Sequence, residues 1–179
     1  MSSELSARLR PVRLGACLSL LTILYAFGLG ASLGLKEDAL KGHLQAEAAK
    51  AAESVYQGDA AKAKAVTAKA WVYLKRAHMH AAGLGAIGVA VSVLLALSAG
   101  HWFLKTASSL ALGLGALGYS VFWMLAALRA PGMGSTGAAK ESLGLLAMPA
   151  AGLCVFGILL AMAAFCRTCC CGATSCDAD

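Results

Sequence analysis

Histidine and cysteine side chains are the residues of this sequence best suited to chemistry, because imidazole nitrogens and thiolates bind transition metals and haem iron. The four histidines are His43, His78, His80 and His101. Folding the charged segment before the second apolar run about Gly58 places His78 roughly opposite Asp38. His43 and Glu37 lie nearby along the chain, so nitrogen and oxygen ligands for a metal would converge there. A structural role, with the histidines hydrogen-bonded at a polar interface, is the favoured alternative.

His78 and His80 lie two residues apart, so on a helix they point in different directions and do not form a metal-binding pair one turn apart. The run Arg76-Ala77-His78-Met79-His80 resembles the R-x-H-x-H start of a transmembrane helix in the heme–copper oxidase subunit I superfamily and its smaller relatives. In that superfamily such a histidine can bind a low-spin haem, so the resemblance implies His78 or His80 as an axial ligand. It covers about ten of the 179 residues. No later histidine cluster is present to hold copper or a second haem, so oxygen reduction is not expected.

Cysteines crowd the end of the last apolar run, at positions Cys166, Cys169, Cys170, Cys171 and Cys176. Cys166 and Cys169 form a C-x-x-C pair that could hold zinc, copper(I) or an iron–sulfur centre. Adjacent cysteines have poor geometry for one tetrahedral site, so an acylated or free-thiol tail is favoured over a metal site. From the sequence we therefore predict no specific cofactor, and haem or a transition metal is the alternative.

Composition indicates the environment of these residues. The chain is 59% hydrophobic and only 13% charged, with a net charge of +6 and a mean hydropathy of +0.72. A soluble domain carries about 25% charged residues, so this chain has too little polar surface for water. Of its 24 formal charges, 13 lie in the segment from Lys36 to Arg76. This charged segment separates the first two apolar runs, each of which is long enough to cross a bilayer.

These patterns predict an all-α integral membrane protein with four spans, built as a helix bundle with an extramembrane helical hairpin between the first two spans. The expected segments are a basic tail (1–13), span 1 (14–35), the hairpin (36–76), span 2 (77–104), span 3 (105–128), a glycine-rich loop (129–141), span 4 (142–166) and a cysteine-rich tail (167–179). Glycines recur in every span, so we expect close helix packing, with Gly85 and Gly152 near interfaces.

The hairpin has its own helical signals. Apolar residues recur at steps of three and four along one face: Leu40, Leu44, Ala48, Ala51 and Val55. Asp59 is expected to cap a second helix that runs from Ala60 without interruption into span 2. Because the stripe is mostly alanine, it buries little area, and a free-standing hairpin would be marginally stable.

The loop before span 4 contains Gly132-Met133-Gly134-Ser135-Thr136-Gly137, a formal G-x-G-x-x-G. A dinucleotide site requires a preceding strand, whereas this run follows a membrane helix. We therefore expect a turn in which Ser135 or Thr136 caps span 4. Pro149 is expected to kink or break the first turns of that span.

Charge gives conflicting indications of orientation. The hairpin and the loop at 129–141 carry ten Lys and Arg residues, against five on the opposite side, so counting alone places the hairpin inside. However, Arg8, Arg10 and Arg13 are packed just before the first span, and a cytoplasmic tail keeps cysteines reduced. We expect a multi-pass protein of the bacterial inner membrane with both termini cytoplasmic.

Catalytic patterns do not stand out. The sequence contains no H-E-x-x-H motif and no carboxylate within an apolar run, so neither zinc hydrolysis nor a membrane proton relay is indicated. We expect a non-enzymatic interaction or accessory component of a membrane complex, in contact with lipid and with its own copies or other membrane subunits, and not with nucleic acid. A haem- or metal-binding redox subunit using His78 or His80 is one alternative, and a small transporter or channel is another.

Overall fold

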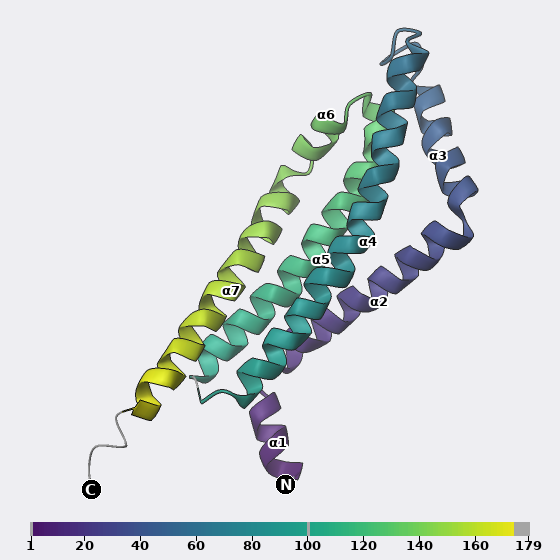
Figure 1. Ribbon diagram of the computed structural model, residues 1–179. Helices are drawn as coiled ribbons and strands as arrows, with labels where there is room; N and C mark the ends of the chain where they lie inside the picture. The colour runs from purple at the N-terminus through teal and green to yellow at the C-terminus, as the bar shows by residue number, and fades with distance from the viewer. Residues whose placement is uncertain (1, 100, 174–179) are drawn as a thin grey trace, which may run out of the picture.

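The computed structural model describes residues 2–99 and 101–173, with side chains described for residues 4–99 and 101–166. Its regular elements are helices (Figure 1): α1 (Ser2–Leu9), α2 (Arg13–Leu35), α3 (Glu37–Lys50), α4 (Ala60–Leu97), α5 (Trp102–Met133), α6 (Thr136–Glu141) and α7 (Gly144–Ala173). Within these residues, four helical stretches are long and apolar enough to cross a membrane, in α2, α4, α5 and residues Gly144–Cys166 of α7. The protein is therefore an all-α, multi-pass membrane protein, as its composition predicts.

Helix α5 lies at the centre of the bundle, where it packs against α2, α4 and α7 (Figure 1). Just over half (56%) of its most apolar window is buried, compared with 17–33% for the other three spans. Small residues permit this packing, since a Cβ atom added to Gly15 of α2 would lie 2.2 Å from the carbonyl carbon of Ser109 in α5. The expected close packing also holds at Gly85, which faces α2, but Gly152 has no neighbouring atom within 4 Å and points away from the bundle.

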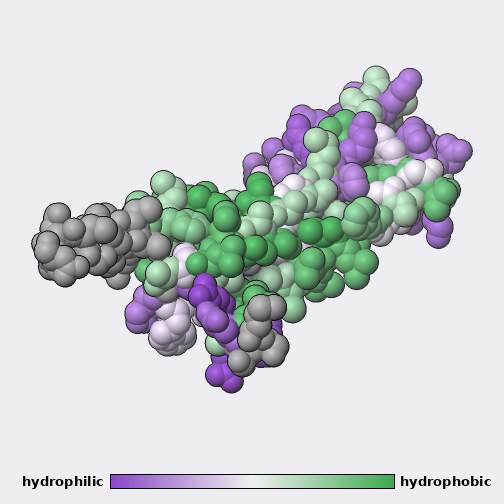
Figure 2. All heavy atoms as spheres, turned by 60° about the horizontal axis from the view of Figure 1, so that its bottom comes forward, coloured by the Kyte–Doolittle hydropathy of each residue, from purple (hydrophilic) through white to green (hydrophobic). Residues whose placement is uncertain are grey.

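The surface divides into bands that match a bilayer. On the face that Figure 2 shows, an apolar belt covers the spans, with a large hydrophilic region at one end and a smaller hydrophilic patch toward the other. Large apolar side chains in the belt remain exposed in the isolated chain, including Leu24 (66%), Phe27 (71%) and Met148 (78%). These side chains are positioned to contact lipid, because a helical span satisfies its backbone internally and can expose apolar groups to hydrocarbon.

The boundary between the second and third spans differs from the sequence prediction of residue 104. Helix α4 ends at Leu97 and α5 begins at Trp102. Ser98 adopts extended backbone after α4, and the His101 ring accepts a hydrogen bond of 3.3 Å from the Phe103 N–H at the start of α5. Neither capping residue is a Lys, Arg, Asp or Glu, so charge did not mark this turn.

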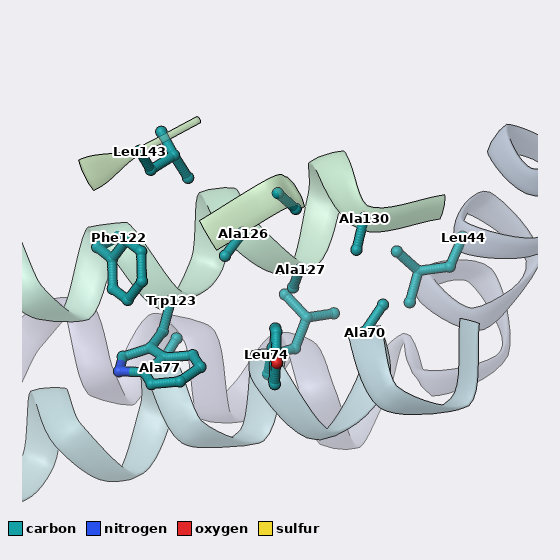
Figure 3. Packing of buried hydrophobic residues seen from close by; sticks show 12 residues of the cluster. Leu44, Ala70, Leu74, Ala77, Phe122, Trp123, Ala126, Ala127, Ala130 and Leu143 are labelled. Atoms are coloured by element: carbon teal, nitrogen blue, oxygen red, sulfur yellow. The ribbon is translucent and has the colours of Figure 1, made fainter. Parts of the chain in front are cut away.

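The hairpin is braced by the rest of the chain and is not free-standing. Helix α4 has 38 residues and α5 has 32, which correspond to about 57 and 48 Å, so both extend well beyond a hydrocarbon core of about 30 Å. We call the resulting extramembrane unit the head: residues 37–71, residues 126–133 of α5, and α6. Leu44 of α3 is only 1% exposed and packs with Ala70 of α4 and Ala130 of α5 (Figure 3).

The hairpin tip also bonds to the end of α5. The Tyr56 hydroxyl donates a buried hydrogen bond of 2.7 Å to the Pro131 carbonyl. Asp59 caps α4 as predicted, its Oδ1 accepting from the Lys62 N–H at 2.9 Å, and α4 runs uninterrupted into the second span. The sequence expectation of marginal stability concerned the hairpin alone; in the whole chain, contacts from α5 supply burial that its alanines cannot.

The glycine-rich loop contains helix α6, which was not predicted. Gly134 ends α5 in the left-handed conformation (φ 64°), and the Ser135 Oγ accepts from the Ala138 N–H at 3.2 Å. Ser135 is thus a helix cap, as one alternative predicted, but it caps α6 and not the fourth span. Pro149 does not break α7, which continues through it from Gly144.

Candidate functional site

His78 faces α2. Its Nδ1 lies 2.9 Å from the Ala26 carbonyl oxygen, a hydrogen bond between helices. A Cβ atom added to Gly30 would lie 2.7 Å from the His78 Cε1, so the ring occupies space that this glycine leaves open. The contact agrees with the structural interpretation of His78, in which a backbone carbonyl satisfies the ring.

His80 faces α5 instead, as expected for residues two apart on a helix. Its ring centroid lies 5.0 Å from that of Tyr119 and 6.0 Å from that of Trp123. The Arg76 guanidinium lies over the rings of Trp123 at 5.0 Å and Tyr73 at 5.4 Å. The R-x-H-x-H run therefore joins α4 to both neighbouring helices through its side chains, and Trp123 is the centre of an aromatic cluster on α5.

The structure does not bring the predicted metal ligands together. Among the side chains of residues 4–99 and 101–166, no group of three or more His, Cys, Asp or Glu is placed to hold a metal ion. His78 turns toward α2, while His43 and Asp38 lie exposed on α3. Glu37 pairs with Lys41 one turn later in the same helix.

Of the predicted cysteine pair, the structure describes the side chain of Cys166 only. Cys166 is exposed near the end of the described side chains and has a free thiol. Cys169 lies outside the residues whose side chains the structure describes, so the proposed C-x-x-C ligand pair falls beyond this description.

A further candidate site is a groove in the head between α3 and α4, with a volume of about 700 Å³. That volume is within the range of binding pockets for small molecules, about 300–1,000 Å³. Its lining residues are mostly alanines and other small or apolar groups: Lys41, Leu44, Gln45, Ala48, Ala49, Ala52, Glu53, Tyr56, Gly58, Asp59, Ala60, Ala63, Lys64, Thr67, Ala68 and Trp71. We call this site the head groove.

Two contacts fix the separation of the groove walls. At the tip, Tyr56 is held on α5 by its hydrogen bond to Pro131. Near the membrane, Leu44 inserts into the core shared by α4 and α5. Because most side chains between these anchors are alanines or other small residues, the two helices leave a space that they do not fill themselves.

Charged side chains give the head groove a polarity along its length. At the membrane end, the Lys41 ammonium lies 5.1 Å from the centre of the Trp71 ring, whereas Glu53 and Asp59, together with Lys64, line the tip half. Burial raises the pKa of Tyr56 above its ordinary value, so its hydroxyl stays neutral and can donate to Pro131. On α3 outside the groove, the hydrogen bond and positive charge of Lys50 lower the pKa of Glu47.

No family model, no curated protein and no solved structure matches this chain. The geometry of the head groove therefore carries the functional inference. Sequence reasoning did not identify the groove, although it identified the stripe that contributes Leu44 and Ala48 to it. The useful signal was the combination of large and small residues in that stripe, because leucine anchors the helix while alanine leaves space beside it.

Proposed function

We propose that this protein is a non-enzymatic interaction component of a membrane complex, and that its head groove binds a helix of a partner subunit. The observation that carries the proposal is the unfilled apolar groove between α3 and α4, outside the membrane-spanning part of the bundle. Amphipathic helices commonly bind by placing an apolar face in such a groove. The partner helix would complete a three-helix arrangement that the hairpin begins.

Small residues on both walls favour a helix as the occupant. Ala49 on α3 and Ala68 on α4 are exposed and line the groove. Alanine surfaces let helices approach closely, whereas helices with larger side chains pack about 8–10 Å apart. Such an occupant would bury the apolar lining that the isolated chain exposes to water.

The charges along the groove favour one direction for the bound helix. A helix carries partial positive charge at its N-terminus and partial negative charge at its C-terminus. Glu53 and Asp59 outnumber Lys64 in the tip half and suit the N-terminus, and Lys41 at the membrane end suits the C-terminus. A helix oriented this way would lead toward the bilayer at its C-terminal end, which fits a partner that is itself a membrane protein.

Photocrosslinking from matched alanines tests this proposal. Benzoylphenylalanine replaces Ala49 or Ala68 in the groove, and Ala46 or Ala65 at exposed positions on the same helices outside it. We expect one defined polypeptide to be crosslinked in native membranes from positions 49 and 68, at least five times more efficiently than from positions 46 and 65. Mass spectrometry of the product identifies whether that polypeptide is another subunit or a second copy of this chain.

Equal crosslinking from all four positions would contradict the proposal, because it would indicate random collision. Crosslinking to lipid alone from positions 49 and 68 would also contradict it, since the occupant would then be an acyl chain. A second copy of the chain in the product would keep the groove as a protein-binding site and identify the complex as a homo-oligomer.

The proposal includes an orientation. We place the protein in a bacterial inner membrane with both termini in the cytoplasm and the head on the opposite side. Support comes from the clustered arginines next to the first span, Arg8, Arg10 and Arg13, because positive residues close to a span are retained on the cytoplasmic side.

A further inference from the structure

The end of the bundle opposite the head contains a second pocket, of about 520 Å³. It is formed by α1, the beginning of α2 and the beginning of α5, and is lined by Ala7, Arg8, Arg10, Pro11, Arg13, Leu14, Trp102, Lys105 and Thr106. We call it the basic pocket. Four of its nine lining residues are cationic and none is acidic, so its chemistry is that of an anion site.

Packing holds the walls of the basic pocket in place. Val12, between α1 and α2, is 1% exposed and belongs to a core cluster with Leu95 and Ala164. One turn further, the backbones of α2 and α5 meet at Gly15 and Ser109. The cationic side chains therefore converge because of the bundle's own contacts, and not because a terminal segment happens to lie nearby.

Most of the positive charge in the pocket lacks an anionic partner. Arg8 pairs with Glu4 at 2.9 Å, and both side chains are largely exposed. The side chains of Arg10 and Arg13 form no ion pair or hydrogen bond within the described part of the chain. Repulsion among these like charges is relieved when an anion binds between them.

Lys105 is an independent indication of a ligand. It is 8% exposed, and its ammonium donates a hydrogen bond to the Ser98 carbonyl oxygen. A buried ammonium group is costly unless it is paired, and here a neutral carbonyl is its hydrogen-bond acceptor. An anion in the adjoining pocket would supply the missing negative charge.

The pocket also has an apolar wall next to the membrane belt. Leu14 and Trp102 line it and are 61% and 64% exposed. Tryptophan is favoured at the level of lipid headgroups, because its ring is apolar and its N–H is polar. In Figure 2, the smaller hydrophilic patch at this end of the molecule lies directly beside the apolar belt.

We propose that the basic pocket binds the phosphate headgroup of an anionic phospholipid. The guanidinium groups of Arg10 and Arg13 contact phosphate oxygens, Lys105 supplies charge from the inner wall, and the acyl chains lie along the belt beside Leu14 and Trp102. Basic pockets between transmembrane helices bind anionic headgroups in this manner. Free phosphate would use the same cations but would leave the apolar wall without a function.

Native mass spectrometry of the full-length protein tests the assignment. The protein is released from mixed micelles that contain equal amounts of phosphatidylglycerol and phosphatidylcholine, and the retained lipids are counted. We expect phosphatidylglycerol to be retained at least tenfold more often. The double variant Arg10→Gln/Arg13→Gln should abolish that preference, since each cation near a membrane surface contributes about fivefold and two together contribute about 25-fold.

A matched control removes the same charge elsewhere. Lys62→Gln/Lys69→Gln changes two exposed lysines of the head and should retain the preference for phosphatidylglycerol. An equal loss in both double variants would overturn the proposal, because net charge and not the pocket would then set the preference. Equal retention of the two lipids by the unchanged protein would overturn it as well.

A third arm separates a lipid from a free anion. Inorganic phosphate at millimolar concentration should not displace phosphatidylglycerol, since it cannot replace the acyl contacts. Displacement by phosphate alone would show that the pocket holds a soluble anion, and the lipid assignment would be wrong. Because Arg10 and Arg13 are exposed, their replacement leaves the core intact, whereas Lys105→Met would test a buried residue at greater risk to folding.

Discussion

Gly134 is required at its position for two separate reasons. Its backbone has φ 64°, a left-handed conformation, and an added Cβ atom would lie 2.3 Å from the Val55 Cγ1 in the hairpin tip. Alanine in that conformation costs about 1–2 kcal/mol before any clash is counted. We expect Gly134→Ala to destabilise the head by at least that amount, measured as a lower thermal midpoint and faster proteolysis of the hairpin in detergent.

Gly132 provides the control, because it lies only two residues earlier. It is within α5, and an added Cβ atom would meet nothing within 4 Å. Gly132→Ala should therefore leave stability unchanged or raise it by about 0.5–1 kcal/mol, as alanine favours a helix over glycine. Destabilisation of equal size in both variants would show that the tip does not depend on Gly134.

The histidines show what residue types alone could and could not establish. The pattern correctly indicated that His78 and His80 face different directions, because their spacing on a helix determines this. It did not identify Gly30 and Trp123 as their neighbours. Those contacts join residues far apart in sequence and depend on the rotation of α4 relative to α2 and α5, which no local pattern specifies.

At the scale of elements, the connection between the hairpin tip and α5 is testable through Tyr56. Tyr56→Phe removes the hydrogen bond to the Pro131 carbonyl while keeping the ring. The expected cost is about 1 kcal/mol, which should accelerate hydrogen exchange of the α3 amides about fivefold. Tyr119→Phe is the control, because the Tyr119 hydroxyl makes no hydrogen bond among the described residues and its ring contacts are preserved.

The same residue predicts a dependence on alkaline pH. Burial raises the pKa of Tyr56 above its ordinary value of 10.0, so the unfolded tip releases the proton more readily than the folded one. The stabilisation is therefore fully present below pH 10 and is lost as pH rises through the folded pKa. Hydrogen exchange of α3 should accelerate from about pH 10 upward relative to the Tyr56→Phe variant, in which this dependence should be absent. If the Tyr56→Phe variant and the unsubstituted protein had the same pH profile, the assignment of this dependence to Tyr56 would be contradicted.

Element boundaries were predictable where charge or capping residues marked them. The first span and the start of α4 follow the sequence closely, because Lys36 ends one apolar run and Asp59 caps the next helix. The α4–α5 turn was missed, since its capping residues, Ser98 and His101, lie among apolar or small residues that leave hydropathy high. Ser135 was predicted as a cap, but its helix was taken to be the fourth span and not the separate short helix α6. The head groove was beyond prediction because it depends on how far apart two helices are held by α5.

On the scale of the whole molecule, the two ends have different chemistry. The head exposes an apolar groove with charges of both signs along it, while the opposite end holds a pocket whose charged lining is entirely cationic. An anionic lipid surface attracts the end that carries the basic pocket, and the cytoplasmic leaflet is the more negative of the two leaflets. The asymmetry supports an orientation in which α1 lies at the cytoplasmic face, even though the head carries more lysines and arginines in total.

Charge count and charge position thus predict opposite orientations, and thiol labelling distinguishes them. In a chain whose seven native cysteines are replaced by serine, Ala61→Cys places a thiol on the exposed face of the head and Ala7→Cys places one beside the basic pocket. A membrane-impermeant maleimide should label position 61 in intact spheroplasts and position 7 only after permeabilisation. The reverse pattern would place the head in the cytoplasm, where the ten positive residues of the head side outweigh the clustered arginines. It would also put the basic pocket against the less anionic leaflet, which leaves phospholipid binding chemically feasible but removes the field that would concentrate the ligand there.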